Sequence, residues 1–176
     1  MDINEARLEL LSALQKFIRR GLEYEALHTA LELEENLHFN ILWNRLKIIA
    51  SEDVGPANQL MPILVESLYK EYVAEKTKLD KKPDDKAHLL FLSNAVVCLC
   101  RSLHNRTVDD LLNVVLLERE KNIGVPIPDY ALDKHTARGR AMDRGWKEFF
   151  EEGSKLVNES GSNPWRKKHM QLRGCD

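Results

Sequence analysis

The stretch from Ala87 to Leu103 restricts the possible folds more than any other part of the chain, because it is apolar on nearly every side of a helix. Its apolar run is broken in the middle only by Ser93 and Asn94. A membrane-spanning helix needs about 20 apolar residues, and strands rarely exceed about 10. A soluble helix without a polar face must be covered by its neighbours. The stretch therefore predicts a central buried helix.

Apolar residues recur at helical spacing in six further stretches. These are 3–20, 23–35, 39–50, from Pro62 to about 78, from Thr107 to about 116, and 146–156. Thr107 with Asp110 also has the pattern of a capping box. No stretch alternates like a half-buried strand. We expect an all-α fold, a single bundle of about seven helices over residues 1–158, followed by a flexible basic tail over 159–176.

An acidic turn follows the helix predicted at 39–50. Glu52 and Asp53 stand where the helix dipole disfavours carboxylates, just before the break at Gly55 and Pro56. One interpretation is a metal site of a nuclease-like enzyme, shared with Asp109 and Asp110. The other is structural, in which the carboxylates accept backbone N–H groups of the next helix or pair with an arginine such as Arg45 or Arg101. We favour the structural interpretation, because no further ligands gather around the turn.

A basic segment lies between residues 134 and 147. The first 120 residues are net acidic and the remainder is net basic. Gly139 and Gly145 would let the backbone approach a phosphate closely. The segment predicts either contact with an anion or nucleic acid, or a strap that pairs with the acidic first two-thirds of the chain or with another subunit. The candidate binding residues are Lys134, His135, Arg138, Arg140, Arg144 and Lys147.

Several classes of protein are not expected from this sequence. No glycine is followed by lysine, which excludes a P-loop for nucleotides. Three cysteines without a framework spacing argue against a disulfide scaffold. No apolar run is long enough for a membrane helix, and the first residues do not resemble a signal peptide. We expect a cytoplasmic protein that has no catalytic activity and needs neither a cofactor nor a metal.

The run from Leu46 to Gly55 carries a resemblance to a known family. With Arg45 before it, the pattern Arg-Leu, then Ala-Ser-Glu-Asp-Val-Gly, is similar to the start of the C-terminal helical domain of the AAA+ replication-associated recombination ATPases. That family includes the Werner helicase-interacting protein. The resemblance extends over about residues 20–130, and its motif residues here are Arg45, Ser51, Glu52, Asp53 and Gly55. The ATPase module is absent, the connection at 79–86 is charged, and residues 133–140 have only a loose counterpart.

The resemblance implies a clamp-loader-collar-like fold, a tetramer-like homo-oligomer and a role in DNA replication, recombination or repair. It also implies an AAA+ ATPase as a partner in trans. Together with the basic segment, this predicts a non-catalytic assembly module that contacts DNA or that ATPase. The alternatives are a small metal-dependent enzyme acting on nucleic acid, which would use Glu52 and Asp53, and a pure protein-interaction adaptor.

Overall fold

The computed structural model describes residues 3–36, 38–78 and 85–175. These residues are all-α and contain no strand, as predicted. The chain forms two compact units, residues 1–121 (unit 1) and 122–176 (unit 2). The expected division at 158–159 therefore differs from the observed one, and the expected single bundle is two units. Among the described helices, none combines the length and the hydropathy needed to cross a bilayer.

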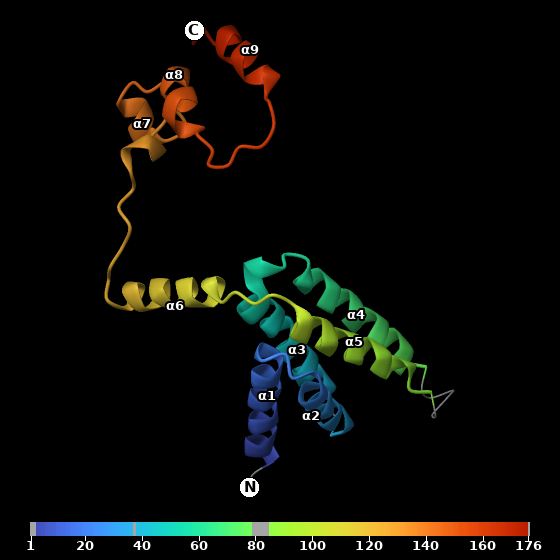
Figure 1. Cartoon of the computed structure of the whole chain (residues 1–176). Helices are drawn as coiled ribbons and strands as arrows, with labels where there is room; N and C mark the ends of the chain where they lie inside the picture. The colour runs from blue at the N-terminus through green and yellow to red at the C-terminus, as the bar shows by residue number, and fades with distance from the viewer. Residues whose placement is uncertain (1–2, 37, 79–84, 176) are drawn as a thin grey trace. The chain divides into compact units, whose positions relative to one another are not determined.

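Unit 1 contains the six longer helices (Figure 1). Their bounds agree closely with the periodicity of the sequence, because the first five of these helices bury the apolar positions that repeat every three or four residues. They are α1 (Ile3–Arg19), α2 (Glu23–Glu35), α3 (Phe39–Ile49), α4 (Met61–Lys76), α5 (Ala87–Arg101) and α6 (Thr107–Glu120). Between α3 and α4, the chain forms a π-helical turn, η1 (Ala50–Val54), and a 3-10 turn, η2 (Gly55–Ala57).

Helix α5 contacts α1, α2, α3 and α4, and so has the central position predicted for it. Leu92, Val96 and Leu99 are fully buried against Trp43 and other residues of the core. One side of the helix, however, exposes Leu90 and Asn94. The helix is therefore central without being covered on every side. The connection expected at 79–86 lies mostly outside the described residues.

The start of α6 differs from the predicted capping box. Thr107 is the first helical residue, and its own N–H is capped by Asn105, whose Oδ1 accepts it at 2.8 Å. The Thr107 hydroxyl does not cap the helix. The expectation failed because an asparagine two residues earlier fills the capping role, which Asn and Ser/Thr perform about equally well.

Unit 2 is built around aromatic rings. It contains η3 (Asp129–Ala131), α7 (Ala137–Ala141), α8 (Trp146–Glu148), the π-helical η4 (Phe149–Gly153) and α9 (Pro164–Leu172). The ring of Phe150 lies 5.9 Å from that of Trp146 and 5.0 Å from that of His169 on α9. Arg166, also on α9, donates to the carbonyl oxygen of Phe150 at 2.7 Å. Residues 164–172 are therefore a helix packed on unit 2, in contrast to the flexible tail expected there.

Candidate interaction surfaces

The acidic turn is enclosed by cationic and amide groups. The Asp53 side chain is 1% exposed. Its Oδ1 accepts from Arg19 Nε at 2.7 Å and from Arg106 Nη1 at 2.6 Å. Its Oδ2 accepts from Gln15 Nε2 at 2.9 Å. The turn thus connects α1 with the loop that precedes α6.

Glu52 shares both arginines with Asp53. Its Oε1 lies 2.8 Å from Arg19 Nη2 and 2.9 Å from Arg106 Nη1. Burial by itself would raise the pKa of Asp53, but the hydrogen bonds from Gln15, Arg19 and Arg106 outweigh it and hold that pKa below its usual value. The Asp53 carboxylate therefore stays ionised and paired at neutral pH.

Two named details of the structural interpretation are wrong. Arg45 does not pair with the carboxylates. It donates to Gln15 Oε1 at 3.0 Å, and Gln15 in turn donates to Asp53. Arg101 pairs with Glu23 on α2 instead. The arginines that bind Glu52 and Asp53 come from 34 and 53 residues away from Asp53 in sequence, so local spacing gave no sign of them.

Gly55 is fixed by close backbone contact. Its φ is +49°, a region that side chains disfavour, and a Cβ would lie 2.7 Å from the carbonyl oxygen of Asn105. Asn105 in turn donates its N–H to the carbonyl oxygen of Asp53 at 2.8 Å. Ser51, the remaining residue of the motif, is exposed. The turn and the loop before α6 therefore hold each other in place.

The metal interpretation finds no ligand set among the described residues. There, no group of three or more His, Cys, Asp or Glu side chains could hold an ion. Glu52 Oε1 and Asp53 Oδ1 already accept from arginine, and Asp53 Oδ2 accepts from Gln15. Asp109 pairs with Arg106 as well, so each of these three carboxylates already has a guanidinium partner.

Helix α6 contains no buried residue, although half of its residues are apolar. Its main contacts within unit 1 are with η1 and η2, next to its first turn, and from there it extends away from the other helices of the unit (Figure 1). Between 41% and 60% of each of its large apolar residues is exposed. These residues are Val108, Leu111, Leu112, Val114, Val115, Leu116 and Leu117. The predicted apolar face is present, but unit 1 does not cover it.

A shallow groove lies where α6 leaves the body of unit 1. Its volume is about 370 Å³. Ile48 on α3 and Val108 and Leu112 on α6 supply its apolar surface. Lys47, Ser51, Glu52 and Asp109 complete its lining. The groove thus combines an apolar floor with two carboxylates at the base of the exposed helix.

The cations of the basic segment of unit 2 differ in how tightly the unit itself binds them. Arg144 is clamped: Nη2 lies 2.6 Å from Asp129 Oδ2, and Nη1 donates to the carbonyl oxygens of Asp129 and Leu132. Arg140 donates to the carbonyl oxygens of Lys134 and His135. The strap is therefore formed within unit 2, and the carboxylate that binds Arg144 comes from Asp129, outside the acidic first two-thirds.

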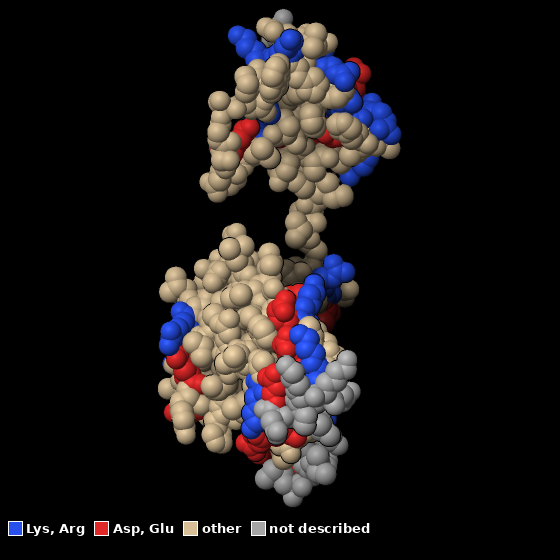
Figure 2. Space-filling model, turned by 90° about the vertical axis from the view of Figure 1, so that its right-hand side faces the viewer, with Lys and Arg blue, Asp and Glu red and all other residues tan. Residues whose placement is uncertain are grey.

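The other four candidate residues differ in their contacts and exposure. Lys134 places its Nζ 3.7 Å from the centre of the Trp146 ring. His135 bonds to Asp133 through Nδ1 at 3.0 Å. Arg138 and Lys147 are exposed, and Lys147 Nζ forms a long surface ion pair with Glu151 Oε1, 4.0 Å away. Figure 2 shows Lys and Arg side chains gathered along one side of unit 2.

The two glycines of the segment serve the fold instead of opening space for a phosphate. A Cβ on Gly139 would lie 1.8 Å from the carbonyl oxygen of Asp133, so that backbone already fills the space. The N–H of Gly145 donates to Glu148 Oε2 at 2.8 Å and begins α8. At Gly139 the expectation of phosphate approach is therefore wrong, because the backbone of Asp133 fills the space, and at Gly145 the N–H is already bound by Glu148.

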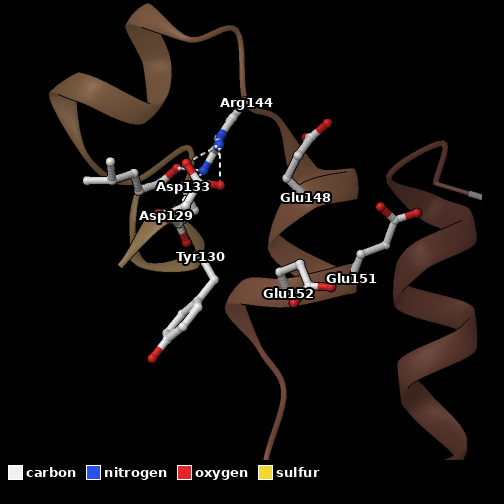
Figure 3. A pocket seen from close by; sticks show the side chains of 8 residues that line it. Asp129, Tyr130, Asp133, Arg144, Glu148, Glu151 and Glu152 are labelled. Carbon is white, nitrogen blue, oxygen red and sulfur yellow. Dashed lines mark hydrogen bonds and ion pairs between the residues drawn. The ribbon is translucent and has the colours of Figure 1, made fainter. Parts of the chain in front are cut away.

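An acidic pocket of about 340 Å³ lies on unit 2 and was not expected from the sequence (Figure 3). Arg144 reaches into it and pairs with Asp129, as the dashed lines in Figure 3 show. The remaining lining residues are Tyr130, Leu132, Asp133, Glu148, Glu151 and Glu152. Glu148 accepts the N–H of Gly145, and Asp133 is hydrogen-bonded to His135. Several carboxylates of the pocket are therefore already bound to neighbouring residues of unit 2.

Comparison with known proteins gives no relative: no protein-family model and no curated protein matches the chain.

Proposed function

We propose that this protein is a non-catalytic helical assembly module that self-associates through the exposed face of α6. The observation that carries the proposal is the exposure of seven large apolar side chains on one helix of 14 residues. Contiguous apolar surface of this kind marks an interaction site in soluble proteins. A helix that is apolar over most of its circumference is stable only when neighbours cover it.

The proposed setting is DNA replication, recombination or repair, and it rests on the resemblance of residues 45–55. In this proposal, unit 1 provides the oligomer, tetramer-like as the resemblance implies. An AAA+ ATPase acts as the partner in trans, and the exposed cations of unit 2, above all Arg138 and Lys147, contact DNA. The network around Glu52 and Asp53 has a structural task, because it holds α6 in position.

Light scattering on the full chain at micromolar concentration tests self-association. We expect a mass well above the 20.3 kDa of one chain, with and without DNA. Leu112→Glu with Val115→Glu places two charges on the exposed face and is expected to give a monomer that unfolds at the same temperature. Leu90→Glu, at a still more exposed leucine on α5, is the control and should leave the mass unchanged.

A strictly monomeric wild-type chain would contradict the proposal. In that case α6 would serve a different protein, which is the adaptor alternative. An oligomer that survives the double substitution in α6 would place the interface elsewhere on the chain.

A further inference from the structure

We infer that the α6 helices of two copies pair antiparallel, each placing its last turn over the groove at the base of the other. This inference rests on the proposed self-association and adds its geometry. The groove is the one lined by Ile48, Val108 and Leu112, with Glu52 and Asp109 among its other residues.

The distribution of side chains around α6 indicates that the helix lies between partners. With about 100° between successive residues, six of the seven apolar side chains, from Val114 through Val108 to Leu116, cover an arc of about 200°. Leu117 lies outside this arc, and Glu118 lies near its edge. Asp109, Asn113 and Glu120 form the polar stripe opposite. One shallow groove covers a much smaller arc, and a second helix from another copy would bury the rest of the face.

The position of Arg119 indicates the relative direction of the two α6 helices. It lies inside the apolar arc, close to the line of Val108 and Leu112, in the last turn of the helix. In a parallel pair, Arg119 would face the Arg119 of the other copy across an apolar contact, and the two helix dipoles would be aligned unfavourably. In an antiparallel pair centred near Val114, Arg119 instead faces the first turn of the other copy.

The groove at that first turn has the matching chemistry. Its apolar floor accepts the methylene groups of an arginine. The three carboxylates next to it, Glu52, Asp53 and Asp109, face only two guanidinium groups within the described part of the chain, those of Arg19 and Arg106. This leaves one carboxylate charge for Arg119 of the other copy. Under a two-fold axis the same contact is made twice, once at each end of the pair. Leu112 then lies opposite Leu116 of the other copy, so apolar side chains face apolar side chains along the middle of the helix.

Cysteine cross-linking tests the direction. Cys98→Ser with Cys175→Ser gives the background, because Cys100 is buried. Val108 and Arg119 are 11 residues apart, about 16 Å along a helix. We expect an equimolar mixture of Val108→Cys and Arg119→Cys chains to form a disulfide-linked heterodimer under mild oxidation. Neither variant alone should form more than a trace of the linked homodimer, and Asn113→Cys, on the polar stripe, is the control that should not cross-link.

The outcomes separate the inference from the proposed function. Homodimers from each single variant, without the heterodimer, would show a parallel pair and overturn the inference. An oligomeric mass without any cross-link would also overturn it, while self-association would stand. A monomeric mass would overturn both. Arg119→Glu in the wild-type chain should weaken association by about two- to five-fold or more, and an unchanged dissociation constant would contradict the role of Arg119.

Discussion

Arg106 Nη1 lies 2.6 Å from Oδ1 of the buried Asp53, and this contact connects the start of α6 to the body of unit 1. The same guanidinium reaches Glu52 and Asp109. Because α6 buries none of its own residues in the unit, its position depends on this polar contact and on the backbone bond between Asn105 and Asp53. The acidic turn is therefore the attachment point of the helix proposed for assembly.

Removing the charge of Asp53 should destabilise unit 1. Asp53→Asn leaves Arg19 and Arg106 facing a neutral amide in a largely buried site. Breaking a fully buried pair costs about 3–5 kcal/mol. Both arginines are about one-third exposed, so solvent screening reduces the expected loss to about 2 kcal/mol. Urea unfolding followed by circular dichroism measures it.

The matched control is Glu66→Gln. Glu66 also has two cationic partners, Lys47 and Lys70, but this group lies on the surface. A surface pair contributes about 0–1 kcal/mol. If Asp53→Asn is no more destabilising than Glu66→Gln, the acidic turn does not hold the fold as described.

The contribution of Asp53 should disappear in acid. Its pKa is lowered in the folded state, and the unfolded value is about 3.9. A carboxylate of this kind contributes stability above the unfolded pKa and loses it as the pH falls through the folded pKa. The difference in unfolding free energy between wild type and Asp53→Asn should therefore be constant from pH 7 to about 5 and shrink below about 4. A difference that grows on acidification would contradict the sign of the pKa shift.

Gly139→Ala should disrupt unit 2. The new Cβ would lie 1.8 Å from the carbonyl oxygen of Asp133, which is backbone and has little room to move. We expect the aromatic cluster around Trp146 to lose protection, seen as faster amide hydrogen exchange in residues 129–153. Gly124→Ala is the control, because no atom lies within 4 Å of its Cβ position. Equal exchange in the two variants would show that the close packing at Gly139 is not needed.

Much of the fold could be predicted from local pattern alone. Helix bounds in unit 1 followed from apolar spacing, because most of these helices bury one face. Gly21, just after the end of α1, and Pro62, in the first turn of α4, also mark helix ends through their backbone geometry. The same pattern predicted an apolar face on α6. It gave no information on whether that face is covered, since coverage depends on elements far away in the sequence or on another molecule.

The candidate site was harder to predict, because its contacts are long-range. Arg19 and Arg106 meet at Asp53 only after α1 and the loop before α6 are packed. The sequence alone did not distinguish these two arginines from the others in the chain as partners of Asp53. In unit 2, the pattern of basic residues identified the segment but did not show which of its cations are bound within the unit. Arg144 is taken by Asp129 and two carbonyl groups, and that geometry depends on the turn at η3.

DNA binding by unit 2 should depend on its exposed cations. Arg138→Ala with Lys147→Ala removes two exposed charges. If both contact phosphates of duplex DNA, the slope of log affinity against log salt should fall by about 1.8, since each neutralised phosphate contributes about 0.9. Fluorescence anisotropy with a labelled duplex at several salt concentrations measures this slope. Lys70→Ala, an exposed lysine of unit 1, should leave the slope unchanged; equal losses in the two variants, or no salt-dependent binding by the wild type, would remove unit 2 as the contact with DNA.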